Sequence, residues 1–410
     1  MKTELKMLNQ GTYGCVFRPS LSCSGKVGNS RKYISKVQLK KRTSENETTI
    51  GAVIRKLPRY ANHFAPVIKT CDVNLAVIND QEIKQCDFLQ TSEQRNHTYE
   101  TNKIRYIGPD TLVDYFQREA DDLGNTPLFF KKFASSYVVL LESLRKLASA
   151  KIIHFDLKEN NIMCSAKTGR PIIIDFGLSI LADTFDAESF QLQDAFFAYA
   201  PDYYPWCIDI CILGYIANEL KRNGDFLDKP VAAEDLDPIV NKFVETSFIH
   251  SAAFDANEQA QFKTDIKTYL RKIVGGNFLT TPTWKTVSDA LLQQWATWDN
   301  YSLACIYLEM IMDFGLASHM KGAAFTTEFL VLLKSIVLAT PDLRKNVNDT
   351  LAQTSRMFDR VETKSYNHLQ KKLEQMLRTP EQVAIRSRKI MASKRDTVMR
   401  EKEVYAHLNM

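Results

Sequence analysis

The sequence predicts an α+β protein with a small strand-rich N-terminal part and a large helical C-terminal part. Short β-branched runs bounded by turn residues lie before residue 112, whereas apolar periodicity of 3.6 residues dominates after residue 135. The chain has 410 residues, of which 45% are hydrophobic and 25% are charged. This is ordinary globular usage and excludes wholesale disorder. At about 150 residues per domain, the length predicts two or three globular units.

Charge and cysteine content limit the classes of partner and compartment. The formal net charge of +5 is too small to indicate nucleic acid by itself. No stretch approaches the ~20 uncharged apolar residues of a membrane span, and the N-terminus has no apolar signal core. The eight cysteines form no Cys-x-x-Cys pair, so we expect buried free thiols in a reducing, intracellular compartment.

The residues that could carry chemistry follow a predicted amphipathic helix at 135–150. Directly after it comes Ile-Ile-His-Phe-Asp-Leu-Lys-Glu-Asn-Asn at 152–161, and a later strand ends in Asp-Phe-Gly at 175–177. A turn at 167–171 makes the two strands a hairpin. Any one acid or amide here could cap a turn, but their joint order favours a shared role. The candidates are Asp156, Lys158, Asn161 and Asp175.

This stretch resembles the eukaryotic serine/threonine protein kinases. His-x-Asp-Leu-Lys-x-x-Asn, followed by a strand and Asp-Phe-Gly, is a highly specific pair of motifs at this separation. The resemblance implies a two-lobed protein kinase fold, with a small β-rich N-lobe and a large helical C-lobe, that uses ATP and Mg²⁺. It implies that Asp156 lies at the acceptor hydroxyl and Lys158 at the moving phosphate. Asn161 and Asp175 would then be the magnesium ligands.

The N-terminal stretch resembles the nucleotide-binding part of the same family. Asn-Gln-Gly-Thr-Tyr-Gly-Cys-Val-Phe at 9–17 is similar to the glycine-rich loop, with Asn9 in place of the first glycine. Glycines there let the backbone close over phosphates without a Cβ clash. Lys36, in Tyr-Ile-Ser-Lys-Val, matches the lysine that binds the α- and β-phosphates. The expected nucleotide-binding residues are Gly11, Gly14, Val16 and Lys36, with backbone groups near Tyr106 and Ile107 at the adenine.

A carboxylate should hold Lys36, and two candidates lie on a helix predicted at 43–57. Glu47 lies at the end of the apolar stripe that continues through Ile50, whereas Glu45 lies about 160° away around the helix. We therefore expect Glu47 to be the partner. Plain charge in the first turn of the helix is the alternative for either residue.

Two stretches compete for the buried helix that the family begins with Asp-x-x-Ser-Leu-Gly. The stretch at Asp209 has the expected position in the chain, whereas the stretch at Asp299 matches the residues of the motif better. Thr-Pro-Asp-Leu-Arg344 resembles the segment whose arginine pairs with an acidic anchor. From Asp209 to Arg344 is 135 residues, too many for a few short helices, and from Asp299 it is 45. We expect the helix to start at Asp299, which leaves Asp202 or Asp209 as the anchor.

This choice leaves residues 210–298 as a helical insertion in the C-lobe. Such an enlarged lobe resembles the serine/threonine kinases of large eukaryotic DNA viruses, which implies the host cytoplasm or the virion as the location. The insertion or the basic tail could bind a docking partner. The alternatives are that the insertion only enlarges the lobe and that the tail is a solvated helix. The expected organisation is an N-lobe at 1–108, a C-lobe with catalytic loop and activation segment at 109–209, the insertion at 210–298, remaining helices at 299–360 and a basic helical tail at 361–410.

Two departures from the family pattern carry expectations of their own. Phe155 stands where many kinases have an arginine that grips a phosphorylated activation loop. An aromatic ring cannot neutralise a phosphate, so we expect activity without phosphorylation in 178–200. A second Asp-Phe-Gly at 313–315 follows a helical pattern, and we expect a helix end there, with Gly315 as the cap.

Two other functions stay open from the sequence. One is a catalytically weak, pseudokinase-like scaffold. The other is a small-molecule phosphotransferase on a kinase-like fold. The presence of Lys36, Asp156, Asn161 and Asp175 favours an active enzyme, and Lys158 favours protein hydroxyls as acceptors.

Overall fold

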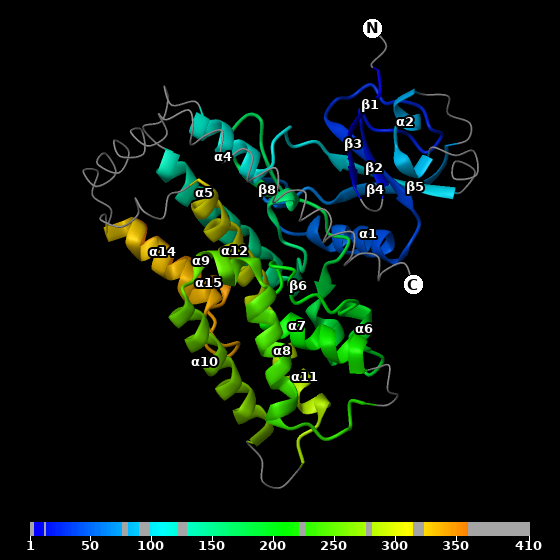
Figure 1. The fold of residues 1–410 in the computed structure, drawn as a ribbon. Helices are drawn as coiled ribbons and strands as arrows, with labels where there is room; N and C mark the ends of the chain where they lie inside the picture. Colours follow the sequence, from blue (N-terminus) through cyan, green and yellow to red (C-terminus); the bar gives the residue numbers. More distant parts are fainter. Residues whose placement is uncertain are drawn as a thin grey trace. The chain divides into compact units, whose positions relative to one another are not determined.

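The computed structural model describes residues 4–11, 14–75, 81–89, 98–121, 129–220, 226–275, 281–314 and 324–359. The chain divides into two compact units, each of which is described by itself (Figure 1). The first comprises Met1–Leu112 and Asn160–Ser179, and the second comprises Val113–Glu159 and Ile180–Met410. The α+β class is confirmed. The expected boundary at residue 108 lies close to Leu112, but residues 160–179 belong with the first unit and not with the rest of 109–209.

The first unit is built around a five-stranded antiparallel sheet in the order β1-β2-β3-β5-β4. A separate hairpin, β7 with β8, follows the catalytic-loop motif, as predicted from the turn between them. Its strands are β1 (Lys6–Gly11), β2 (Gly14–Arg18), β3 (Tyr33–Leu39), β4 (Val67–Asn74), β5 (Thr98–Arg105), β7 (Ile162–Cys164) and β8 (Pro171–Ile173); its helices are α1 (Arg42–Ile54), α2 (Gln81–Lys84) and short 3-10 turns at Tyr60–Asn62 and Asp87–Leu89.

Strand register gives the sheet an apolar face and a more polar face. Cys15, Val37 and Thr101 lie opposite one another across β2, β3 and β5, and laterally paired residues share a face. The adjacent row, Val16 with Lys36, therefore points to the other face, on which α1 packs. The apolar face carries the core residues Leu5, Cys15, Phe17, Leu21, Val37, Val73, Leu75, Ile83, Cys86, Leu89 and Tyr99.

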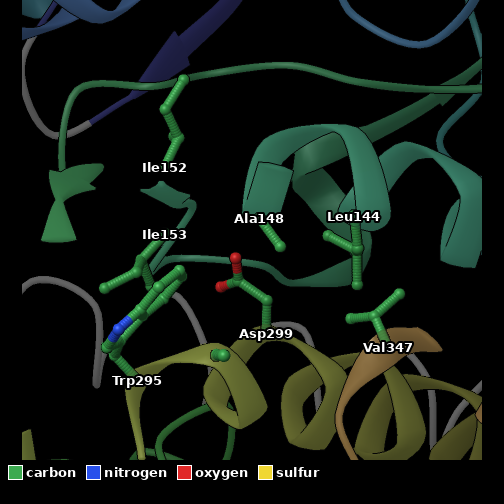
Figure 2. A pocket seen from close by; sticks show the side chains of 8 residues that line it. Leu144, Ala148, Ile152, Ile153, Trp295, Asp299 and Val347 are labelled. Atoms are coloured by element: carbon green, nitrogen blue, oxygen red, sulfur yellow. The ribbon is translucent and has the colours of Figure 1, made fainter. Parts of the chain in front are cut away.

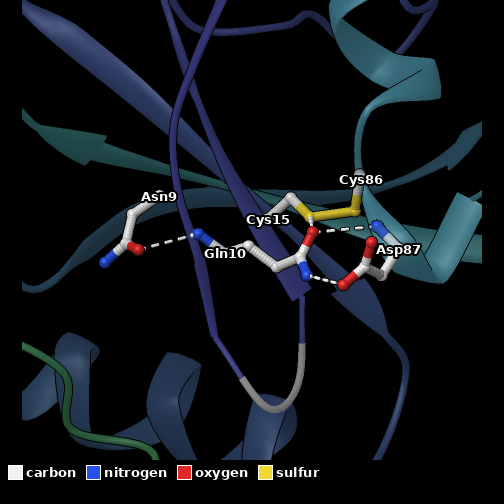
Figure 3. Close-up of a disulfide and its surroundings, with 5 residues drawn as sticks. All are labelled: Asn9, Gln10, Cys15, Cys86 and Asp87. Carbon is white, nitrogen blue, oxygen red and sulfur yellow. Dashed lines mark hydrogen bonds between the residues drawn. A yellow bond between two sulfur atoms is a disulfide. The ribbon is translucent and has the colours of Figure 1, made fainter. Parts of the chain in front are cut away.

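The prediction of free thiols is wrong for four of the eight cysteines. Cys15 is bonded to Cys86 (Figure 3), and Cys23 is bonded to Cys71. The partners are 71 and 48 residues apart in sequence, so no local spacing could have indicated them. Each bond joins a strand residue, Cys15 in β2 or Cys71 in β4, to a residue outside the strands. The prediction is confirmed for the other four, Cys164, Cys207, Cys211 and Cys305, which are free and buried.

One disulfide ties the hairpin of β1 and β2 to the segment 81–89. Hydrogen bonds reinforce the tie: the Asp87 N–H donates to Gln10 Oε1 at 2.8 Å, and Gln10 Nε2 donates to the Asp87 carboxylate (Figure 3). The Met7 N–H also donates to Glu82 Oε2 at 2.8 Å. The strands on either side of the expected glycine-rich loop are therefore held by covalent and polar contacts.

The last strand of the sheet begins earlier than the sequence indicates. The polar stretch 86–100 by itself predicts a loop, but Thr98, Tyr99 and Glu100 belong to β5. Tyr99 and Glu100 pair with β3 on one side and with β4 on the other, and Thr98 pairs with β4. Thr and Tyr favour strands, and pairing on both sides outweighs the weak strand propensity of Glu100.

The second unit is mostly helical. Its one described strand pair is β6 (Ile152–Ile153) with β9 (Ile180–Leu181). Most of the described part of 210–298 is helical, as expected of the insertion. The helices are α4 (Leu112–Asp121), α5 (Phe129–Ser149), α6 (Leu192–Ala195), α7 (Ile208–Tyr215), α8 (Ala233–Thr246), α9 (Phe248–Ala253), α10 (Ala256–Gly275), α11 (Trp284–Leu292), α12 (Trp298–Asp313), α14 (Ala324–Val337) and α15 (Val347–Asp359), with a π-helix at Ile216–Leu220 and 3-10 turns at Glu159–Asn161, Ala182–Asp186 and Trp295–Thr297.

Helix α12 forms the centre of this unit, since nearly all of its residues are buried. It ends at Asp313 with Phe314 as the C-cap. The second Asp-Phe-Gly therefore marks a helix end, as predicted. Gly315, the expected cap, and the basic tail 361–410 lie outside the described residues.

Candidate functional site

Lys36 joins two carboxylates within the first unit. Its Nζ lies 3.2 Å from Glu47 Oε2 and 2.9 Å from Asp175 Oδ1. Burial alone would lower the pKa of Lys36, but the carboxylates of Asp175 and Glu47 outweigh it and raise that pKa above its ordinary value. Burial raises the pKa of Glu47, although the charge of Lys36 opposes the shift. The lysine thus stays charged and is held between two oxygens.

Helix α1 supplies the partner of Lys36, as its periodicity predicts. Glu47 is 2% exposed, whereas Glu45 is exposed on another side of the helix. Asn46, between them, donates from Nδ2 to the carbonyl oxygens of Gly177 and Ser179 at 2.9 and 2.7 Å. One helix therefore contacts both β3 and the segment after Asp175. No sequence pattern indicated this role for Asn46.

The hairpin of β7 and β8 brings the two expected magnesium ligands near each other. The Asn161 carbonyl oxygen accepts from the Ile174 N–H at 2.9 Å, so Asn161 lies beside the residue that precedes Asp175. Asp175 has a φ of 60°, a left-handed conformation that Asp tolerates better than most residues. Its side chain is 41% exposed while bonded to Lys36. A carboxylate and an amide oxygen are hard ligands, so the pair fits Mg²⁺.

The expected nucleotide-binding glycines lie at the ends of two paired strands. Gly11 ends β1 opposite Gly14, which begins β2; residues 12–13 are outside the described part. A Cβ on Gly14 would collide with the Val37 carbonyl oxygen, so this glycine is also required for β2 to pack against β3. Val16 is half-buried and lies directly opposite Lys36, which places it on the face of the sheet that carries the lysine.

Backbone groups at the expected hinge are partly engaged. The Tyr106 N–H donates to the Lys32 carbonyl at 2.9 Å, and the Ile107 carbonyl accepts from the Ala166 N–H at 3.4 Å. The Tyr106 ring is covered by the Arg18 guanidinium, 3.5 Å from the ring centroid. An adenine contact at these residues is therefore restricted to the Tyr106 carbonyl and the Ile107 N–H, which narrows the expectation from the sequence.

A buried polar side chain beside Lys36 was not predicted. Asn102 lies opposite Lys36 in β5 and is fully buried. Neither its Nδ2 nor its Oδ1 has a hydrogen-bond partner within the described residues, and the same holds for Thr70 Oγ1 and Glu100 Oε1. Their row positions place these side chains on the face that carries Lys36. Because this strand partly read as a loop, no sequence pattern indicated their burial.

In the second unit, Asp156 and Lys158 form a buried pair. Lys158 Nζ lies 3.2 Å from Asp156 Oδ2, and each residue is 5% exposed. The Tyr203 hydroxyl donates to the other oxygen, Asp156 Oδ1, at 2.5 Å and accepts from Lys158 Nζ at 3.4 Å. The structure thus brings together the two residues that the sequence motif names and adds Tyr203, which the motif could not reveal.

Asp299 holds the backbone just before Asp156. Its Oδ2 accepts from the His154 N–H at 2.7 Å and its Oδ1 from the Phe155 N–H at 3.0 Å. Phe155 has a φ of 69°, which is strained for a bulky residue and persists only when the surroundings enforce it. Figure 2 shows the Asp299 carboxylate pointing away from α12 into a small pocket. The pocket is lined by Leu144, Ala148, Ile152, Ile153, Trp295, Ala296, Asp299 and Val347.

Of the two candidate anchors, Asp209 pairs with Arg344. Arg344 Nη2 lies 2.8 Å from Asp209 Oδ2, and both side chains are fully buried. Trp298 Nε1 donates to Asp209 Oδ1 at 3.3 Å, and Arg344 Nη1 donates to Thr297 Oγ1 at 3.2 Å. The pair therefore joins α7 to the start of α12. A buried helix does begin beside Asp299, and of Asp202 and Asp209 it is Asp209 that pairs with Arg344.

The function of the chain has to be inferred from the geometry described above. In the described ranges, no three His, Cys, Asp or Glu side chains gather in a way that could hold a metal ion. Among those same residues, no helix is both long enough and apolar enough to span a membrane. No protein-family model matches the chain, and no curated protein matches it.

Proposed function

We propose that the protein is an ATP-dependent serine/threonine protein kinase with the two-lobed kinase fold. The observation that carries the proposal is Lys36, held between Glu47 and Asp175. A lysine in this setting is charged and oriented in advance, which suits a ligand of the α- and β-phosphates. Buried ion pairs add little stability compared with apolar residues of similar volume, so stability alone gives a weak reason for this one.

Residues of the first unit suit the binding of Mg-ATP. Lys36 would hold the α- and β-phosphates while Glu47 keeps it in place. Gly11 and Gly14 lack a Cβ and would let the backbone approach the phosphates. Asp175 and Asn161 would hold Mg²⁺, which neutralises charge on the β- and γ-phosphates when bound. Val16 would pack on the adenine, beside the backbone of Tyr106 and Ile107.

Residues of the second unit suit the acceptor side of the reaction. Asp156 would accept the hydrogen bond and then the proton of a Ser or Thr hydroxyl. The acceptor oxygen bonds to the γ-phosphorus, the bond from that phosphorus to the β,γ-bridging oxygen breaks, and ADP leaves. Lys158, beside Asp156, would stabilise the negative charge on the transferred group. A lysine two residues after the aspartate favours serine and threonine over tyrosine as acceptors.

Contacts outside the chemistry also support this proposal. The family places an aspartate at the start of a buried helix and an arginine–acid pair after the activation segment. Asp299 and the pair of Asp209 with Arg344 occupy those positions. The long helical insertion supports the narrower likeness to kinases of large DNA viruses. A location in the host cytoplasm or virion and a docking role for 210–298 depend on that likeness.

The test is phosphate transfer from labelled ATP to a generic protein and to the protein itself. Asp156→Ala and Lys36→Met should each abolish transfer. Lys40→Met, which removes an exposed lysine four residues further along, should leave the rate unchanged. Chelation of Mg²⁺ should stop the reaction.

Other outcomes would favour the alternatives. Transfer that persists in Asp156→Ala would reject the catalytic assignment. No transfer by the wild type, with nucleotide still bound, would favour a scaffold. Transfer only to small hydroxyl compounds would favour a small-molecule phosphotransferase.

A further inference from the structure

Three aromatic side chains of one short segment each donate a hydrogen bond to the loop that carries Asp156. The Tyr203 hydroxyl donates to Asp156 Oδ1 at 2.5 Å, and the Tyr204 hydroxyl donates to Glu159 Oε2 at 2.5 Å. Trp206 Nε1 donates to the Phe155 carbonyl oxygen at 2.9 Å. We call Tyr203, Tyr204 and Trp206 the aromatic clamp.

We propose that Tyr203 is a positioning residue, which orients the Asp156 carboxylate and the Lys158 ammonium for phosphoryl transfer. The inference rests on the kinase function proposed above and goes beyond it, because Tyr203 would neither touch the acceptor nor take its proton. It acts through the two residues that do the chemistry.

The Tyr203 hydroxyl is fixed in place by its surroundings. The residue is 3% exposed, and its ring packs edge-on against Trp206 with the centroids 5.0 Å apart. The backbone N–H of Trp206 donates to the Tyr203 carbonyl oxygen at 3.0 Å. Ser302, on α12, donates from Oγ to the Pro205 carbonyl at 2.6 Å. The segment is thus attached to the central helix of its unit, and the hydroxyl cannot leave Asp156 without disrupting these contacts.

The Asp156 carboxylate is held through both of its oxygens. An ionised carboxylate has two oxygens with about four acceptor sites, so it can rotate unless both oxygens are engaged. Tyr203 engages Oδ1, and Lys158 lies 3.2 Å from Oδ2. Both oxygens of Asp156 are therefore oriented. Errors of about 1 Å in such geometry reduce rates by ~100-fold.

The aromatic clamp holds the Asp156 loop without a phosphorylated residue. Phe155 occupies the position where an arginine would grip a phosphorylated activation loop. Its strained backbone is held by Trp206 on the carbonyl side and by Asp299 on the N–H side. Burial, and then the nearby Glu159, raise the pKa of Tyr204 well above its ordinary value, so its hydroxyl stays a donor at physiological pH.

The test compares Tyr203→Phe with Tyr199→Phe under the transfer assay. Tyr203→Phe removes only the hydroxyl at Asp156, whereas Tyr199→Phe removes a hydroxyl from the same segment, where the ring packs on Tyr215. Hydrogen bonds to charged groups are worth enough to change a rate by about 10- to 100-fold. We expect kcat of Tyr203→Phe to fall by about that factor. The Kd for Mg-ATP, the KM for the protein acceptor and the Tm should stay close to those of Tyr199→Phe.

The outcomes separate this inference from the proposed function. A fall in kcat without a fall in Tm supports positioning, since a merely structural hydroxyl would lower both. A Tyr203→Phe enzyme that keeps at least half of its kcat, or gains activity, overturns positioning and leaves the kinase assignment intact. A wild-type protein that transfers no phosphate at all overturns the proposed function, and the positioning role with it.

Discussion

Replacing Arg344 by Met should strongly destabilise the second unit. Two unit charges 2.8 Å apart attract by about 6 kcal/mol at an effective dielectric constant of about 20. Desolvation of both groups offsets most of this attraction. Removing one partner alone leaves the other charge buried, and such changes cost about 3–5 kcal/mol. In Arg344→Met, Asp209 would keep the Trp298 N–H as a donor but no cation in place of Arg344.

Tryptophan fluorescence during urea unfolding is the natural assay. The chain has four tryptophans, and all of them, at 206, 284, 295 and 298, lie in the second unit. The signal therefore reports this unit alone. The matched control is Lys285→Met, which breaks an ion pair with Asp289 whose side chains are 58% and 52% exposed. Its free energy of unfolding should change by less than about 0.5 kcal/mol.

A double-mutant cycle separates the pair from its surroundings. Asp209→Leu should destabilise about as much as Arg344→Met, because it leaves the guanidinium buried with only the Thr297 hydroxyl as an acceptor among the bonds described above. The double variant should cost much less than the sum of the two single changes. The reasoning is refuted if Arg344→Met costs under about 1 kcal/mol, or if the two changes simply add.

Three further predictions concern other parts of the chain. Burial lowers the pKa of His250 to about 3, so below pH ~6.5 the unfolded state binds a proton that the folded state does not. The free energy of unfolding should therefore fall as the pH falls below ~6.5, by up to about 1.4 kcal/mol per pH unit. His250→Phe should remove that part of the pH dependence, measured by urea unfolding. Cys86→Ser opens a link between residues 71 apart and should destabilise the first unit by about 4 kcal/mol through chain entropy, seen as faster amide exchange in β1 and β2 but not in α12. Phosphatase treatment should leave kcat unchanged, since Phe155 offers no cation to a phosphate; a large loss would contradict this.

Local patterns in the sequence were enough for much of the candidate site. The helix around Glu47 has a single apolar stripe, which was enough to indicate Glu47 and not Glu45 as the partner of Lys36. The turn at 167–171 fixed the hairpin that carries Asn161 and Asp175 to one end. In each case the deciding sequence signal lies within a short helix or hairpin, where residue periodicity and turn chemistry determine geometry.

Contacts between distant segments could not be predicted in the same way. Tyr203 reaches Asp156 across 47 residues, and the disulfide partners are 71 and 48 residues apart. Asn102 is buried because strands pair on both sides of it, although its own segment partly read as a loop. The Asp209–Arg344 pair was a partial exception, because the family resemblance indicated Arg344 and left Asp202 or Asp209 as its partner.

The long helical segment between Asp209 and Asp299 also has a simple energetic consequence. Asp209 and Arg344 are 135 residues apart, and most of that interval is the segment 210–298. Loop-closure entropy grows only with the logarithm of length, so lengthening this interval about threefold costs about 1 kcal/mol. Removing one partner of the buried pair costs about 3–5 kcal/mol, several times that entropy difference. Asp299 holds the backbone before Asp156, and Asp209 holds Arg344, through residues outside 210–298, which leaves the surface of that segment available for a role separate from the proposed chemistry.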